Sequence, residues 1–284
     1  MAPGTLKIGF SSKFAARISV EHQKWMDLKP FRTLLRTTGA AFTALTASGC
    51  VVRPSKNLPF ARALGYGILE SDPRGLLDLP PGFQYRVLSS LGDVMSDGGT
   101  VPDKADGMGC FDLGEGRIAL VRNHELVSTD DGGGSFSLGF GQKDGRFVPG
   151  GTTHIILDQA TMEVSQQFRS LGGTIRNCSG GVTPWGSWLS CEESPTGPGQ
   201  KYGEGLQQNH GWVFEVPAAV SGLIDPVPLV AMGRFNHEAA CVDAATGHVY
   251  LTEDRDDSVL YRFVPNKSMF ILSGKTGKPR RSTF

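Results

Sequence analysis

The sequence lacks the features that mark several common classes of protein. It has only five cysteines, an odd number without CxxC spacing, which argues against a zinc ribbon and a dense disulfide framework. Its 28 basic and 28 acidic residues leave no net charge, whereas proteins that follow a nucleic-acid backbone normally carry a basic face. We therefore expect no nucleic-acid partner. A small anionic substrate is compatible with this balance, because one Arg or a bound metal supplies local charge.

The apolar run near the N-terminus is short. Residues 37–49 are small and mostly apolar and follow a basic segment at 29–36, which is typical of an export signal. The run is too short for a permanent transmembrane helix. It is similar to a weakened twin-arginine signal, and Cys50 follows a lipoprotein-like cleavage box. We expect a periplasmic or secreted protein; the alternative is a loosely packed N-terminal helix.

Convincing amphipathic helices are also missing, while glycine and proline are plentiful, at 38 and 17 residues. They separate short segments rich in β-branched and aromatic residues, a pattern typical of many short strands. We expect an extension at 1–50, a linker at 51–76 and one all-β domain at 77–284, built as a sandwich, barrel or propeller. The expected strands are 85–88, 117–122, 153–157, 187–191, 211–216, 237–242, 248–252 and 259–264.

One recurrence favours the β-propeller. Several expected strands run directly into a polar, acidic cluster. The spacing between clusters is long for a single blade, so intervening strands must be shared or inserted. These clusters are Asn123-His124-Glu125, Cys191-Glu192-Glu193 and Thr252-Glu253-Asp254.

Strand-end carboxylates predict a metal site. An unpaired buried carboxylate is costly, but carboxylates from separate strands that converge in one pocket are compensated by multivalent cations. Oxygen ligands suit Ca²⁺, Mg²⁺ or Mn²⁺, and a thiolate suits iron or zinc, so a mixed set indicates more than one metal. The candidates are Asn123, Glu125, Glu192, Glu193, Glu238 and Asp254, with Cys110 as a thiolate.

Each candidate also has an ordinary structural reading. Acidic residues at strand ends are often solvated loop positions, and a cysteine between glycine and phenylalanine is often a small buried hydrophobe. His237 could simply bind backbone, and Arg234 could be a surface ion-pair partner. The spacing of Cys178 and Cys191 also leaves a cross-strand pair open. The recurrence of the His-Glu pair, at 124–125 and 237–238, favours the metal site.

Several motifs in order resemble the PhoX-type alkaline phosphatase family, which is also described as a bacterial domain family of unknown function. The resemblance runs from about residue 77 to 265 and is most specific at residues 176–193. The motifs are Asp106-Gly107-Met108-Gly109-Cys110, Arg122-Asn123-His124-Glu125, Gly150-Gly151-Thr152-Thr153, Arg176-Asn177-Cys178-Ser179-Gly180-Gly181, Thr183-Pro184-Trp185-Gly186-Ser187-Trp188, Cys191-Glu192-Glu193, Gly233-Arg234-Phe235-Asn236-His237-Glu238-Ala239 and Tyr250-Leu251-Thr252-Glu253-Asp254.

The resemblance implies a six-bladed β-propeller that hydrolyses phosphate monoesters after export, using a cluster of iron and calcium ions. By motif, it implies iron at Cys110 and calcium at Asn123 and Glu125. Further cluster ligands would be Glu192 or Glu193, Glu238 and Asp254, with Arg234 or His237 near the phosphate. The resemblance thus implies Ca²⁺ and Fe³⁺ as cofactors and a small phosphate ester as substrate, in a chain that we expect to be monomeric.

The chain departs from the family in length, because family members continue well beyond Phe284. We therefore expect the last blades to be missing, with exposed strand edges, low stability and impaired metal binding. Two other functions stay open. One is an exported propeller that binds calcium or a ligand without catalysis, and the other is a lactonase- or phosphotriesterase-like hydrolase.

Overall fold

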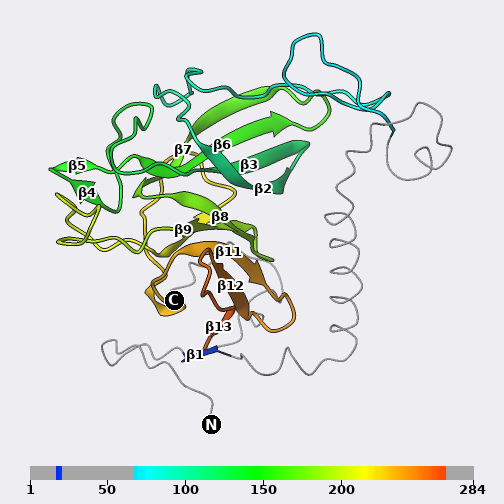
Figure 1. Ribbon diagram of the computed structural model, residues 1–284. Helices are drawn as coiled ribbons and strands as arrows, with labels where there is room; N and C mark the ends of the chain where they lie inside the picture. Colours follow the sequence, from blue (N-terminus) through cyan, green and yellow to red (C-terminus); the bar gives the residue numbers. More distant parts are fainter. Residues whose placement is uncertain (1–16, 21–66, 267–284) are drawn as a thin grey trace, which may run out of the picture. The chain divides into compact units, whose positions relative to one another are not determined.

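The computed structural model describes residues 17–20 and 67–266, and the regular secondary structure of this part is almost entirely β-strand (Figure 1). Within these ranges the only helical element is the 3-10 turn η3 (Val230–Met232), and no helix is long and apolar enough to cross a bilayer. The predicted all-β class is therefore confirmed. The segment that resembles an export signal, with Cys50, lies outside the described residues.

The smaller of two compact units covers residues 23–88. In its described part, Glu70 and Leu79 form an antiparallel bridge, and the carboxylate of Asp72 organises the loop between them. This carboxylate accepts three backbone N–H groups and the hydroxyl of Tyr85. The hydrogen bond from Tyr85 contributes most to lowering the pKa of Asp72. The segment is thus ordered locally by one side chain.

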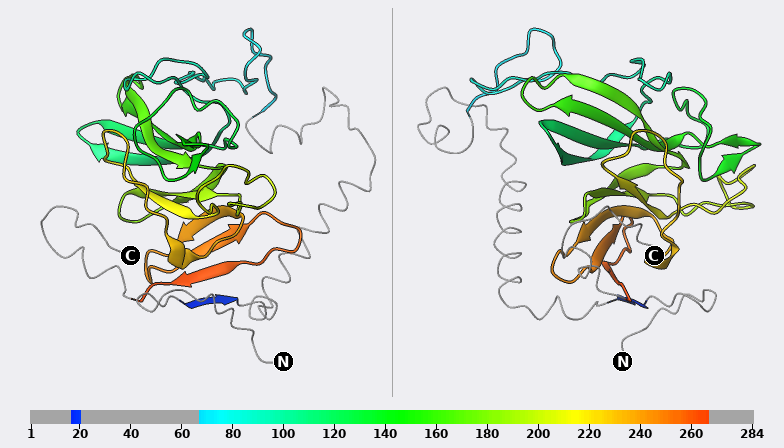
Figure 2. Two further views of the ribbon diagram at one scale, coloured as in Figure 1. Left: turned by 90° about the vertical axis from the view of Figure 1, so that its left-hand side faces the viewer. Right: turned by 180° about the vertical axis from the view of Figure 1, so that it is seen from behind.

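The larger unit, residues 1–22 and 89–284, contains antiparallel sheets (Figures 1 and 2). The first has the order β2-β3-β6-β7, the second β8-β9-β10 and the third β11-β12-β13, with β1 beside β13; β4 and β5 form a separate hairpin. Their bounds are β1 (Arg17–Val20), β2 (Ala105–Gly114), β3 (Arg117–His124), β4 (Gln142–Lys143), β5 (Arg146–Phe147), β6 (Gly150–Asp158), β7 (Val164–Thr174), β8 (Asn177–Val182), β9 (Ser187–Glu192), β10 (Val213–Pro217), β11 (His237–Val242), β12 (Val249–Glu253) and β13 (Tyr261–Val264).

Most of the expected strands are present. Seven of the eight predicted segments coincide with β3, β6, β9, β10, β11, β12 and β13. The segment 85–88 forms no strand, so that prediction is wrong. Six strands were not predicted: the short β1, β4 and β5, and the longer β2, β7 and β8, which are rich in glycine or polar residues.

The middle sheet is buried on both faces. Alternate side chains of a strand point to opposite faces, so neighbouring residues of β9 enter different cores. Trp188 packs in a cluster with Phe111 and Phe214, whereas Leu189 packs in another with Leu251. The first, second and third sheets therefore lie as successive layers, and the views in Figure 2 show the same order.

The first strand of each sheet lies close to its counterpart in the next. Strand β8 contacts both β2 and β11. A Cβ atom added at Gly107 would lie 2.7 Å from the Cα of Ser179, and one at Gly181 would overlap the carbonyl oxygen of Ala240. Glycine is therefore required where these strands approach one another.

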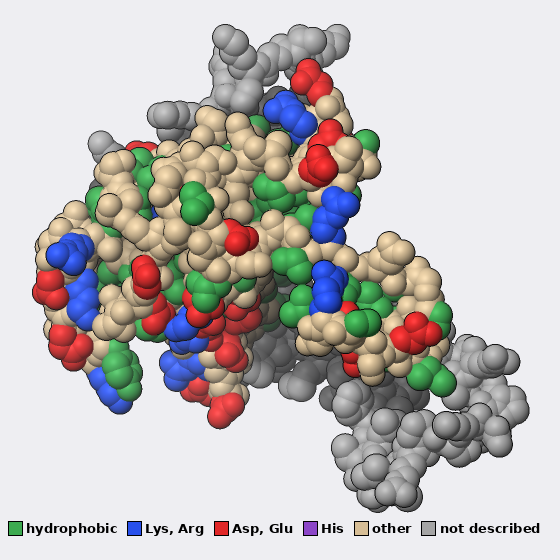
Figure 3. All heavy atoms as spheres, turned by 90° about the horizontal axis from the view of Figure 1, so that it is seen from above, with side chains coloured by type: hydrophobic (Ala, Val, Ile, Leu, Met, Phe, Trp, Pro, Cys, Tyr) green, Lys and Arg blue, Asp and Glu red, His purple; other side chains and the backbone are tan. Residues whose placement is uncertain are grey.

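Charged side chains of both signs share the surface. On the face seen in Figure 3, Lys and Arg side chains lie beside Asp and Glu side chains. This mixture is what the equal numbers of basic and acidic residues in the sequence lead us to expect.

The buried ring of His154, on β6, makes stability dependent on pH. The ring stacks on Phe168 with centroids 5.2 Å apart, and burial lowers its pKa from 6.5 to about 4. The unfolded chain takes up a proton near pH 6.5 and the folded chain only near pH 4. The stability from the neutral ring is therefore complete above pH 6.5 and is lost as the pH falls towards 4.

We expect His154→Phe, which keeps a ring of similar shape, to remove this dependence. The loss of unfolding free energy between pH 7 and pH 5 should shrink by about 2 kcal/mol relative to the parent chain. Urea denaturation at the two pH values measures it. Equal losses in variant and parent would show that His154 does not titrate in this way.

Candidate metal centre

Three strand pairs repeat one local geometry. The first paired residues are Ala105 with His124 in β2–β3, Asn177 with Glu192 in β8–β9, and His237 with Glu253 in β11–β12. The next paired residues are three positions on in the first strand but two positions back in the second strand, in all three pairs. One extra residue in the first strand is the signature of a β-bulge, which redirects side chains and is frequent beside active sites.

The repeat brings six side chains to the same end of the sheets. One set stands in the bulge, at the second position of each first strand. The other set follows the last residue of each second strand. The bulge residues are Asp106, Cys178 and Glu238, and the residues after the strands are Glu125, Glu193 and Asp254.

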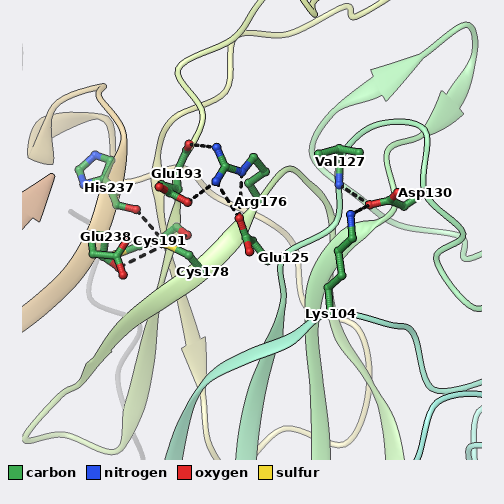
Figure 4. A network of polar contacts seen from close by, with 10 residues as sticks. All are labelled: Lys104, Glu125, Val127, Asp130, Arg176, Cys178, Cys191, Glu193, His237 and Glu238. Carbon is green, nitrogen blue, oxygen red and sulfur yellow. Dashed lines mark hydrogen bonds and ion pairs between the residues drawn. The ribbon is translucent and has the colours of Figure 1, made fainter. Parts of the chain in front are cut away.

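The tightest part of this group contains a thiol and two carboxylates. Cys178, Glu193 and Glu238 each offer a ligand atom, and these atoms lie within 4.8 Å of one another. Figure 4 shows Cys178 and Glu238 on neighbouring strands with Glu193 facing them. The Cys178 Sγ lies 3.2 Å from the carbonyl oxygen of His237 and 3.4 Å from that of Glu238. The ligand atoms of Cys178, Glu193 and Glu238 are close enough to one another to bind one ion together.

The carboxylates of the group repel one another. The pKa of Glu193 is raised from 4.5 to about 7, mainly by burial, with smaller raising effects of Asp254, Glu238 and Glu125 against the lowering effect of Arg176. Burial also raises the pKa of Glu238 and Asp106, with Glu125 contributing to both. These groups favour a compensating positive charge.

A guanidinium supplies part of that charge. Arg176 Nε donates to Glu125 Oε1 at 2.9 Å, and its Nη2 lies 2.8 Å from the same oxygen and 2.6 Å from Glu193 Oε2 (Figure 4). One side chain therefore joins the carboxylates that follow β3 and β9. The group comprises five carboxylates, one thiol and one arginine.

Comparison with known proteins identifies the family. The sequence matches the family described as Alkaline phosphatase PhoX over residues 64–161 and 151–278, which is more than half of the chain. The chain belongs to the PhoX family. No curated protein and no solved structure matches it.

Four of the ligands predicted from the sequence lie in the group of the PhoX chain described above: Glu125, Glu193, Glu238 and Asp254. Within the described residues, the close triad contains two of them. Cys178, Asp106 and Arg176 were not among the predicted site residues. Cys178 was considered only as a partner for Cys191, and both thiols are free. Their place in the repeat could have identified them. Asp106 and Cys178 are each the second residue of the first strand of a pair, and Arg176 directly precedes such a strand.

Asn123 has structural partners for its whole side chain. It is fully buried; its Nδ2 donates to the carbonyl oxygens of Cys178 and Ser179, at 3.1 and 2.8 Å. Its Oδ1 accepts from Trp188 Nε1 at 3.0 Å and from Ser190 Oγ at 2.9 Å. The amide thus links β3 to the bulge that holds Cys178, and its role as a calcium ligand stays a prediction.

Glu192 is likewise occupied by protein donors. It is fully buried, and its Oε1 accepts from Ile175 N at 2.8 Å and His210 Nδ1 at 2.7 Å. Its Oε2 accepts from the backbone N–H groups of Gly211 and Trp212, at 2.8 and 3.1 Å. The structure therefore separates adjacent glutamates: Glu192 fixes the loop before β10, while Glu193 faces the group.

The other predicted residues lie outside the close triad. Cys110 is exposed and pairs across the sheet with Leu120. Arg234 donates to the carbonyl oxygens of His210, at 2.6 Å, and Pro195. The ring of His237 is buried; its Nε2 lies 3.1 Å from Gly233 O, and burial lowers its pKa to about 4. Their roles as iron ligand and catalytic residues stay predictions.

Proposed function

We propose that this PhoX chain hydrolyses phosphate monoesters with the help of metal ions held at the strand-end group. The observation that carries the proposal is the triad of one thiol and two carboxylates within 4.8 Å, surrounded by three further carboxylates. Phosphoryl transfer depends on positioning and charge neutralisation more than on covalent chemistry by the protein. A dense group of anionic ligands is the arrangement that such chemistry needs.

The donor types divide the group into two parts. Cys178, with Glu193 and Glu238, offers a sulfur and two oxygens, a set that suits iron. Asp106, Glu125 and Asp254 offer only oxygens, which suits calcium. Together these residues fit the iron and calcium that the family resemblance implies, with Cys178 as the sulfur ligand in this proposal.

Bound cations would polarise the phosphoryl oxygens and stabilise the departing alkoxide. The chain itself supplies the framework: three bulges aim the ligands, and the buried amide of Asn123 fixes the backbone at Cys178. The residues therefore orient the ligands before a cation binds.

We further propose that the three sheets are blades of a β-propeller. Their first strands lie side by side, and each sheet contributes ligands from the same end, as blades around a common axis do. The six-bladed ring, the export to the periplasm and the monomeric state belong to the same proposal.

The test is hydrolysis of p-nitrophenyl phosphate by the full chain, with Ca²⁺ and Fe³⁺ supplied and then removed by a chelator. We expect hydrolysis that stops on chelation and returns with the metals. Glu238→Gln should lower the rate at least about tenfold, because it removes a charge from the triad. Glu163→Gln, at an exposed turn, is the matched control and should keep the parent rate.

Other outcomes distinguish the remaining functions. Cation binding without hydrolysis of any ester would contradict the phosphatase and favour a non-catalytic binding protein. Hydrolysis of lactones or phosphotriesters, but not of monoesters, would favour the lactonase- or phosphotriesterase-like hydrolase. Hydrolysis that is indifferent to chelation would contradict the metal centre.

A further inference from the structure

Arg176 and Lys104 occupy equivalent places in the repeat. Each directly precedes the first strand of its pair, and each has a positive φ, 49° and 52°. The carbonyl oxygen of Lys104 accepts from Glu125 N, and that of Arg176 accepts from Glu193 N, both at 2.9 Å. Two basic side chains thus start from the same backbone arrangement.

Their side chains go to different partners. Lys104 Nζ lies 2.6 Å from Asp130 Oδ2, outside the strand-end group, whereas Arg176 binds Glu125 and Glu193 (Figure 4). A non-glycine residue with positive φ carries backbone strain that the surroundings must offset. At Arg176 the backbone N–H also donates to Leu126 O at 2.8 Å. Hydrogen bonds of its N–H group and of its carbonyl group therefore fix the backbone of Arg176.

The atoms that Arg176 engages are the ones a cation would need. Glu125 Oε1 receives two contacts from the guanidinium, and Glu193 Oε2 receives one. A guanidinium and a multivalent cation cannot both lie within bonding distance of these oxygens without strong repulsion. An arginine is always protonated in proteins, so raising the pH does not remove the competing charge.

We propose that Arg176 is an internal counter-ion that competes with cations for Glu125 and Glu193 and thereby weakens cation binding at the centre. This rests on the proposed metal centre and adds a residue that sets its affinity. The guanidinium stabilises the carboxylates until a cation replaces it. The opposite role, in which Arg176 merely orients the ligands, would make its removal weaken binding.

The experiment is isothermal titration of the full chain with CaCl₂ and, separately, MnCl₂ at constant ionic strength. We expect Arg176→Gln to bind these cations at least about tenfold more tightly than the parent chain, because a repelling unit charge has been removed. Arg176→Lys keeps the charge but can reach fewer oxygens at once, so its affinity should lie between the two. Lys104→Gln, at the equivalent position whose side chain binds Asp130 and not the group, should match the parent.

The possible results separate this inference from the proposed function. Weaker or equal binding in both Arg176 variants, with parent-like circular dichroism, overturns the counter-ion. If Arg176→Gln does not fold, Arg176→Lys decides: binding tighter than that of the parent supports the counter-ion, and weaker or equal binding overturns it. Tighter binding in Lys104→Gln by the same factor would show a general charge effect and would also overturn it. Cation binding by none of the proteins would overturn the metal centre and this inference together.

Discussion

Glu192→Gln is expected to lower the free energy of unfolding by about 3 kcal/mol, whereas the same substitution at Glu193 should not lower it. All the donors around Glu192 are N–H groups, two on each oxygen. A glutamine would turn its NH₂ towards at least one backbone N–H group in either orientation, leaving that donor buried without an acceptor. The measurement is urea denaturation at pH 8 in the presence of a chelator.

Glu193 should respond differently because its surroundings oppose its charge. Its pKa is raised to about 7, so at pH 8 the folded state holds a carboxylate that burial and neighbouring acids disfavour. That penalty is complete above pH 7 and disappears below the unfolded pKa of 4.5. Glutamine removes it, and Arg176 keeps Glu125 as a partner. Unfolding free energy should therefore stay equal or rise at pH 8.

The pair also tests which glutamate holds metal. Glu193→Gln should weaken binding of metal ions, Fe³⁺ first, while its fold is intact, and folded Glu192→Gln should retain more of it. A reversed pattern, with Glu193→Gln destabilised and Glu192→Gln stable but unable to bind metal ions, would contradict the assignment made from the structure.

The sequence predicted that carboxylates follow the strands, but not which carboxylate of each pair points where. Adjacent residues of a strand face opposite sides, and one residue of register decides the side. The pairing of Asn177 with Glu192 sets that register, and pairing is not visible in composition or spacing. The recurrence was therefore found, while Glu192 and Glu193 could not be told apart.

The missed strands have a physical cause of the same kind. Strands β2 and β8 contain glycines where neighbouring strands approach closely, so they lack the β-branched residues that mark a strand in a sequence. Cys178 lies on β8 and was overlooked as a site residue for this reason. The exposed Cys110 lies on β2, several residues beyond the bulge. The bulge, which selects Asp106 and Cys178, arises only from the pairing of two strands.

Asn123→Asp is expected to lower the free energy of unfolding by about 3 to 5 kcal/mol, because it puts an unpaired charge where an amide made four hydrogen bonds. Two carbonyl oxygens would face a carboxylate in place of the NH₂ group. The carbonyl of Cys178 is one of them, so the bulge that carries the thiol should shift as well.

The same substitution distinguishes a structural role of Asn123 from a role as a calcium ligand. If Asn123 bound calcium directly, a carboxylate at this position should tighten Ca²⁺ binding, since added ligand charge strengthens calcium sites. If it holds the bulge, Ca²⁺ binding should weaken along with stability. Urea denaturation and calcium titration of the one variant measure both, and Asn209→Asp, on the loop before β10, is the control. Because the buried amide has no free acceptor or donor, we expect the joint loss, as the proposed metal centre would then depend on a polar contact between two sheets.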